Sequence, residues 1–260
     1  MAVAQINGQS INYADTGGDG PAVLFSHGFL MDHSMFDAQV DALSDTYRCV
    51  AWDERGFGAT PATEPFTYWD SADDAVALLD HLGIDQAVLV GMSQGGFLSL
   101  RAALAHPDRV KALVMIDSQA GTEDPAALEG YQAMMAHWMS DEPLGDVGEF
   151  VAGLILGSPE LAAEWIPTWE SRRDPSFQFP SDTLLSRDDI TDRLGEIACP
   201  VLSIHGDADQ AISMERAEAV QSGVADGRGL VVVPGAAHAP NMSHVDIVNP
   251  ALVEFLGTVC

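Results

Sequence analysis

The stretch "VLVGMSQGGF", residues 88–97, places one serine between an apolar run and a pair of glycines. Gly91, Ser93 and Gly95 give it the spacing G-x-S-x-G. A turn of this kind exposes a serine where a strand ends and a helix begins, and its sharp backbone tolerates only small neighbours. The N–H groups of a helix that starts after Ser93 would also face a developing anion. The stretch therefore predicts a nucleophilic serine on a strand-to-helix turn.

Short apolar runs alternate with helical patterns on both sides of this turn, as is typical of parallel strands buried on both faces. The alternation predicts an α/β fold with a doubly wound, mostly parallel sheet. We expect strands at residues 22–28, 47–56, 86–93, 110–118, 200–206 and 229–235. We expect helices at residues 35–43, 70–82, 94–105 and 214–223 and at the C-terminus. A turn at Asn7-Gly8 between strand-like halves predicts an antiparallel hairpin at one sheet edge.

Residues 119–197 break the alternation, because they contain no strand-like buried run. We predict that this segment is a helical cap inserted into an α/β core made of residues 1–118 and 198–260. Four large apolar residues of the segment either pack it onto the sheet or line an apolar slot for a substrate. They are Met134, Trp138, Trp165 and Trp169.

The charge balance is strongly acidic, with 39 Asp and Glu against 11 Lys and Arg and a formal net charge of −28. Such a surface repels phosphate backbones and anionic lipid, so we expect no nucleic-acid or membrane partner. Cys49, Cys199 and Cys260 are odd in number and unclustered, which favours free thiols. Neither a dinucleotide-binding nor a P-loop motif is present, and no spacing suggests a metal site, so we expect no cofactor. With no recognisable leader or membrane-length apolar run, we expect a cytoplasmic protein.

A serine nucleophile needs a base, and the base needs an orienting acid. On a sheet of this type the expected chain order is serine, acid, histidine. Asp207 and Asp209 follow one strand in "HGDAD", and His238 follows the next strand in "GAAHAPN". Asp117, at the end of an earlier strand, is an alternative acid, and His244 is the competing base. Since these strand ends meet at one edge of the sheet, the groups can converge on one crevice.

The motifs "SHGF", "DERGFG", "GMSQGG", "HGDAD" and "GAAHAPN" occur in the order and spacing of one family. Along nearly its whole length the chain resembles an α/β-hydrolase of the esterase and enol-lactone hydrolase kind. The resemblance implies that Ser93 is the nucleophile, His238 the base and Asp209 the acid. It also implies an oxyanion hole made by the backbone N–H groups of Phe29 and Gln94.

Two positions depart from the pattern of that family. Thr60 stands where serine is usual, and Ser213 stands where proline is frequent. A serine rather than an aspartate at the nucleophile position argues against dehalogenase and epoxide-hydrolase chemistry.

The resemblance implies a cofactor-independent serine hydrolase that cleaves small carboxylic esters or lactones through an acyl-serine intermediate. Three alternatives use the same fold. The triad could cleave a carbon–carbon bond in a vinylogous diketone, or it could support perhydrolysis. A receptor that binds a small molecule and turns it over slowly is the third. The sequence leaves the substrate and the oligomeric state open.

Overall fold

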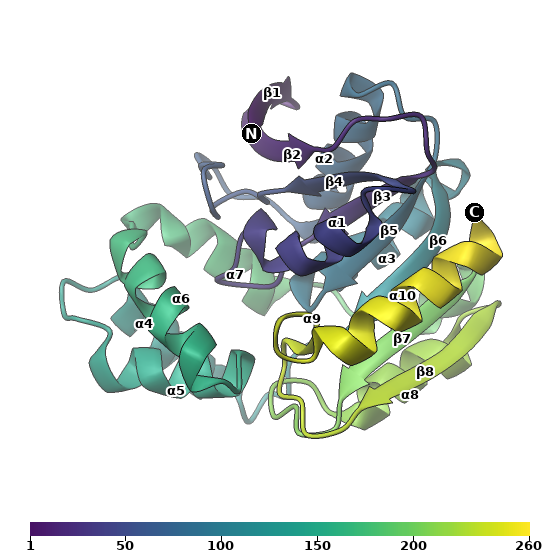
Figure 1. Ribbon diagram of the computed structural model, residues 1–260. Helices are drawn as coiled ribbons and strands as arrows, with labels where there is room; N and C mark the ends of the chain where they lie inside the picture. The colour runs from purple at the N-terminus through teal and green to yellow at the C-terminus, as the bar shows by residue number, and fades with distance from the viewer.

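The computed structural model describes residues 1–260 as one eight-stranded sheet in the order β1-β2-β4-β3-β5-β6-β7-β8 (Figure 1). The strands from β4 through β3 to β8 pair in parallel, whereas β1 and β2 are antiparallel to their neighbours. The predicted α/β fold with a doubly wound, mostly parallel sheet is confirmed. The strands are β1 (Ala2–Ile6), β2 (Gln9–Asp15), β3 (Ala22–Ser26), β4 (Arg48–Trp52), β5 (Ala87–Met92), β6 (Val110–Ile116), β7 (Val201–Gly206) and β8 (Gly227–Val233).

The predicted hairpin forms β1 and β2 at the edge of the sheet. Ile6 pairs with Gln9, so the connecting turn consists of Asn7 and Gly8. Both turn residues have positive φ, 49° and 79°. This geometry matches the right-handed twist of the flanking strands, and asparagine followed by glycine adopts it at the least steric cost.

Helices cover both faces of the sheet, with α1 (Asp37–Leu43) and α10 (Val245–Val259) in front in Figure 1. Behind it lie α2 (Tyr68–His81), α3 (Gln94–Ala105) and α8 (Met214–Gly223). Every residue of β3, β5 and β7 is buried, which explains why these strands are apolar runs rather than alternating patterns. The bounds of α3 and α8 are those expected from the sequence.

Four α-helices lie between β6 and β7, and no strand interrupts them. We call residues 119–197 the cap segment, and in Figure 1 its helices stand to one side of the sheet. Its boundaries with the core, and its role as a cap, stay predictions. The helices are α4 (Leu128–Trp138), α5 (Gly145–Ile155), α6 (Pro159–Ser171) and α7 (Gln178–Ser186).

The tryptophans of the cap segment pack against one another in its interior. The ring centroids of Trp138 and Trp169 are 5.7 Å apart, and those of Trp165 and Trp169 are 6.4 Å apart. All three side chains are buried. Because these three rings are buried against one another, their positions favour the interpretation that they pack the segment together.

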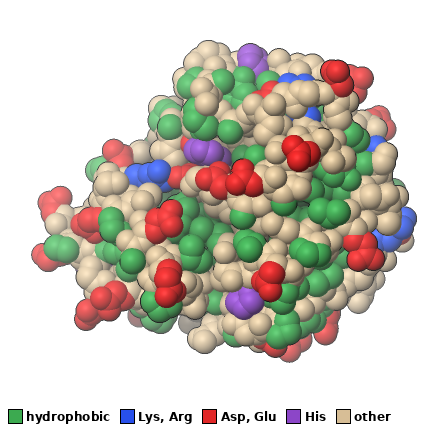
Figure 2. Space-filling view, in the orientation of Figure 1, with side chains coloured by type: hydrophobic (Ala, Val, Ile, Leu, Met, Phe, Trp, Pro, Cys, Tyr) green, Lys and Arg blue, Asp and Glu red, His purple; other side chains and the backbone are tan.

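Acidic side chains are scattered over the face shown in Figure 2, with few basic ones among them. Most of the arginines form ion pairs, such as Arg55 with Asp74 and Arg101 with Asp188. Lys111 is the only lysine. It lies near the start of β6, at the amino edge of the parallel sheet. None of the helices combines the length and apolar character needed to span a membrane.

Candidate active site

Ser93 occupies a strained turn at the carboxyl edge of the sheet, between β5 and α3. Its φ of 49° and ψ of −113° are unusual for a residue with a side chain. The backbone is held from both sides, since its N–H donates to the Ile116 carbonyl at 2.9 Å. Its own carbonyl accepts from the Ser118 hydroxyl at 2.8 Å. The turn is therefore fixed by the neighbouring strand as well as by its own sequence.

Three glycines around Ser93 are required by close backbone packing. A Cβ on Gly91 would overlap the Gly95 carbonyl, and a Cβ on Gly95 would overlap the carbonyl oxygen of Ser26. A Cβ on Gly96 would overlap the Ser118 side chain. In the first two cases the obstacle is backbone, so no side-chain rotation can relieve it. The helix can approach the sheet this closely only with glycine at these positions.

His238 and Asp209 form a hydrogen-bonded pair. The His238 Nδ1 atom lies 2.7 Å from Asp209 Oδ2, and both side chains are almost fully buried. The other oxygen of Asp209 accepts from the backbone N–H groups of Ala211 and Ile212. Burial alone would raise the pKa of Asp209, but the His238 charge and these hydrogen bonds hold that pKa below its usual value. Asp209 is therefore a carboxylate aimed at one imidazole nitrogen.

Asp117, the alternative acid, lies beside Asp209 but hydrogen-bonds elsewhere. Its Oδ1 accepts from the Gly206 N–H at 3.0 Å, and the side chain is completely buried. Burial, reinforced by the Asp209 charge, raises the pKa of Asp117 well above its usual value. Burial and mutual repulsion thus separate the pKa values of the two carboxyl groups, and the one that bonds to His238 has the lower pKa.

The remaining candidates are engaged outside this pair. Asp207 is exposed, and its Oδ1 accepts from the Gly235 N–H at 2.6 Å, which closes the loop. His244 forms its side-chain hydrogen bond with the neighbouring Ser243 hydroxyl at 2.9 Å. The structure therefore joins His238 to Asp209 rather than to either rival acid.

The loop after β3 brings the Phe29 N–H next to the Ser93 turn. A Cβ on Gly28 would overlap the Met92 sulfur, which shows how closely the two segments approach. The Phe29 N–H donates no hydrogen bond within the chain. The Gln94 N–H belongs to the first turn of α3, where the helix itself supplies no acceptor. Neither of these two N–H groups has an acceptor within the chain, as the predicted oxyanion hole requires.

His27 braces this loop from beneath. Its Nδ1 lies 2.8 Å from the Gly28 carbonyl, and its Nε2 accepts from the Glu54 N–H at 3.0 Å. Leu30, three residues after His27, has a φ of 69°. This left-handed conformation is energetically unfavourable for a residue with a branched side chain. A completely buried imidazole with both nitrogens engaged helps the loop to hold that conformation.

Ser93 and His238 line one cavity whose empty space is about 580 Å³, including the part open to solvent. Its wall combines the loop after β3, the Ser93 turn, α3, the cap helices α4, α5 and α7, and the loop after β7. The lining is mainly hydrophobic, and it includes Met134 but none of the three buried tryptophans. It also contains Glu123 and Tyr131, which the sequence did not single out. Glu123 precedes α4 and Tyr131 lies on it, and no motif in the sequence marks either residue.

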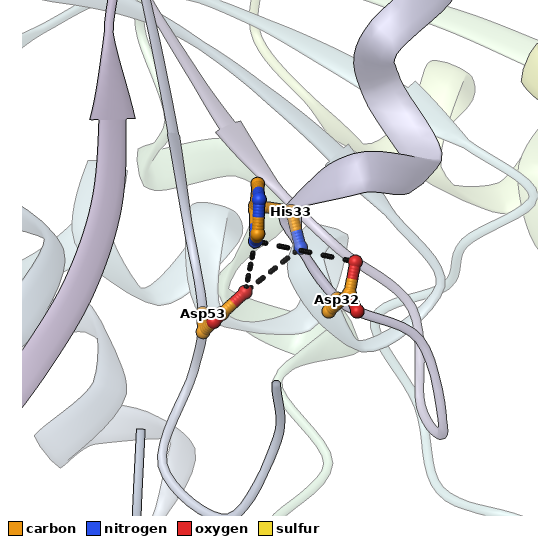
Figure 3. Close-up of side chains that lie close together, drawn as sticks. All are labelled: Asp32, His33 and Asp53. Carbon is orange, nitrogen blue, oxygen red and sulfur yellow. Dashed lines mark hydrogen bonds and ion pairs between the residues drawn. The ribbon is translucent and has the colours of Figure 1, made fainter. Parts of the chain in front are cut away.

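A second cluster, Asp32, His33 and Asp53, joins the loops after β3 and β4 (Figure 3). The His33 Nδ1 atom lies 2.6 Å from Asp53 Oδ1, and the His33 N–H donates to the same oxygen at 2.9 Å. Asp32 accepts from Ser34 through one oxygen and pairs with Arg172, from the end of α6, through the other. The side-chain atoms of this cluster that could ligate a metal already form hydrogen bonds and ion pairs within the chain. The cluster therefore holds the two loops together and connects the cap segment to the core.

The family model for the alpha/beta hydrolase fold matches residues 21–245. The chain therefore belongs to the α/β-hydrolase family, and it is a hydrolase. Both the fold and the family expected from the sequence are confirmed.

Three similar proteins show the range of chemistry within the family. The chain is 30% identical to 2-(acetamidomethylene)succinate hydrolase from Mesorhizobium japonicum, over 92% of this chain and 89% of that protein. It is 28% identical to 3-oxoadipate enol-lactonase 2 from Acinetobacter baylyi, over 77% of this chain and 76% of the lactonase. A solved structure of a thermophilic esterase from Thermogutta terrifontis has a TM-score of 0.87 and 29% identity, covering 96% of this chain and 94% of the esterase.

Proposed function

We propose that the protein is a cofactor-independent serine hydrolase that cleaves small carboxylic esters or lactones. The observation that carries the proposal is the shared cavity of Ser93 and His238, with His238 bonded on its far nitrogen to the Asp209 carboxylate. A serine on a strained turn and an imidazole oriented by a buried acid are the parts that acyl transfer requires. The esterase and the enol-lactonase among the similar proteins support the same reaction class.

In the proposed mechanism, His238 Nε2 takes the proton of the Ser93 hydroxyl as its oxygen attacks the substrate carbonyl. The N–H groups of Phe29 and Gln94 bind the resulting oxyanion, and loss of one such donor typically costs about 10²- to 10³-fold in rate. His238 then passes the proton to the leaving alcohol oxygen, which leaves an acyl group on Ser93. Water, activated by His238, releases the acid. Asp209 holds the imidazole tautomer and stabilises its protonated form.

The cap segment would complete the site by covering this edge of the sheet. Met134 and other apolar side chains of α4, α5 and α7 line the cavity opposite Ser93. We assign the segment the role of excluding water and shaping the slot for the acyl or alcohol part of the substrate.

The test is acid release, followed at constant pH, from a panel of short linear esters, aryl esters and lactones. Ser93→Ala serves as the blank, and circular dichroism checks that this variant is folded. We expect turnover of at least one class to fall by about 10⁴-fold or more in the variant. Ser93-independent turnover would contradict the mechanism. Tight binding of these compounds without turnover would favour the receptor alternative, and cleavage of diketones alone would favour carbon–carbon bond hydrolysis.

A further inference from the structure

The apolar cavity contains one charged group besides the proposed catalytic pair. Glu123 lies in the loop between β6 and α4, and Tyr131 lies on α4; both line the cavity that contains Ser93 and His238. Almost all of the other lining side chains are hydrophobic. Placing a carboxylate among hydrophobic side chains costs free energy unless a partner compensates its charge. The position of Glu123 therefore needs a structural explanation.

Glu123 is held in place by a buried arginine. Arg187 Nη2 donates to Glu123 Oε1 at 2.8 Å, and its remaining donors bond to the carbonyls of Gly121 and Leu184. The guanidinium also stacks over the Phe97 ring, 4.4 Å from its centroid. With its donors and one face engaged, this arginine is not free to bind an anionic substrate. It fixes the orientation of the carboxylate instead.

Two polar atoms at this end of the cavity have no partner within the chain. They are the second oxygen of Glu123, Oε2, and the hydroxyl of Tyr131. Burial, followed by the charge of Glu123, raises the pKa of Tyr131 to about 12. The hydroxyl is therefore protonated at neutral pH and can both donate and accept a hydrogen bond. An unpaired carboxylate oxygen accepts only, so the pair is complementary to a hydrogen-bond donor on a ligand.

The same carboxylate disfavours a negatively charged ligand. None of the residues that line the cavity is a lysine or an arginine. A second carboxylate about 5 Å from Glu123, with the Arg187 charge about 3 Å farther away, would be rejected by about 10-fold at the effective dielectric constant of a partly buried site. Two of the similar proteins, by contrast, are named for dicarboxylates, a succinate and an adipate derivative.

We propose that Glu123 and Tyr131 form a specificity subsite, which selects uncharged esters or lactones ending in a hydrogen-bond donor and rejects those ending in a carboxylate. The inference rests on the proposed function, because it assumes that the substrate carbonyl reacts at Ser93. It adds the chemical class of the group that occupies the rest of the cavity. Glu123 acts on the choice of substrate and takes no part in bond breaking.

The experiment compares three esters of equal size whose chains end in isopropyl, primary amide or carboxylate. These ends have nearly the same shape, so the comparison isolates charge and hydrogen bonding. One series carries the end group on the acyl chain and a second on the alcohol, which covers both orientations. We expect kcat/KM in one series to be highest for the amide and lower by about 10-fold for the carboxylate.

Glu123→Gln removes the charge but keeps an acceptor for Arg187. It should raise the ratio of kcat/KM for the carboxylate ester to kcat/KM for the isopropyl ester by about 10-fold or more. Glu129→Gln is the matched control, because Glu129 is an exposed residue of α4 outside the cavity and its loss changes the net charge equally. Tyr131→Phe should reduce the preference for the amide without helping the carboxylate ester.

Equal effects of Glu123→Gln and Glu129→Gln would overturn the proposal, because general surface charge would then explain the selectivity. So would the absence of selectivity in both wild-type series. If Glu123→Gln does not fold, the wild-type ratio is measured at about 0.5 M salt, where exposed charges are screened. A ratio that persists supports a buried subsite, and one that collapses overturns it. Ester cleavage that survives in Ser93→Ala would instead contradict the proposed function itself.

Discussion

The carboxyl edge of the sheet and the cap segment obey different constraints, and their glycines show the difference. At the sheet edge, a Cβ on Gly91 or Gly95 would overlap backbone atoms. In the cap segment, a Cβ on Gly130 or Gly153 would meet nothing within 4 Å. The edge is fixed by backbone against backbone, whereas the cap segment is held by side-chain packing. The proposed chemistry therefore lies where backbone packing restricts substitution, and the proposed selectivity lies where side chains set the packing.

The largest expected effect is on kcat, and it distinguishes two carboxyl groups at the sheet edge. Asp209→Asn should lower kcat by about 10³- to 10⁴-fold, because an amide no longer holds the required tautomer of His238. Asp117→Asn should leave kcat close to that of the wild type, because its neutral side chain can still accept from the Gly206 N–H and His238 keeps its bond to Asp209. Steady-state kinetics on the best ester decides. A larger loss in Asp117→Asn than in Asp209→Asn would make Asp117 the acid.

Replacement of glycines tests the comparison directly through stability. Gly95→Ala should lower the free energy of unfolding by about 3 kcal/mol or more, since the new methyl group meets a backbone carbonyl. Gly153→Ala, at an exposed position inside α5, should raise it by about 0.5–1 kcal/mol, because alanine is the better helix former. Urea unfolding at neutral pH measures both. Similar changes in the two variants would remove the proposed difference between the regions.

The smallest expected effect is on the pH dependence of stability. The pKa of Asp117 is raised in the folded protein, so its contribution to stability is fully present below the unfolded-state pKa, near 4. This contribution is lost as the pH rises from there through the raised value. Asp117→Asn cannot ionise, so its free energy of unfolding should fall less steeply over that range. Denaturant titrations at a series of pH values test this, and identical profiles for the two proteins would contradict it.

The sequence also predicts the sheet edge in more detail than it predicts the cap segment. The turn at Ser93 admits so few residue types that spacing alone places the serine and its glycines. The approach of His238 to the loop after β7 also follows, because β7 and β8 are neighbours in the sheet, but only the family resemblance favoured Asp209 over Asp207. The ends of strands are predicted less accurately. Strand β8 ends at Val233, two residues earlier than expected. It ends there because Pro234 has no N–H to donate to the neighbouring strand and Gly235 turns the chain with a φ of 76°.

The cap segment could be predicted as helical but not in its contacts. Many arrangements of apolar helices bury the same tryptophans, so the sequence does not show which side chains face the cavity. Glu123 looks like an ordinary polar residue before a helix, and its role becomes visible only when Arg187, from the far end of the segment, is placed beside it. The Asp32, His33 and Asp53 cluster was likewise hidden, because it joins two loops that are distant in the chain.

The single lysine allows the protein to be coupled to a solid support in a defined orientation. Lys111 is partly exposed near the amino end of β6, whereas Ser93 lies beyond the carboxyl end of the neighbouring parallel strand. Once the α-amino group of Met1 is blocked, a reagent or solid support that reacts with amines therefore attaches to the molecule at the edge opposite its cavity. Molecules coupled through this one ammonium group would all present the cavity mouth to the solution, without any engineered tag.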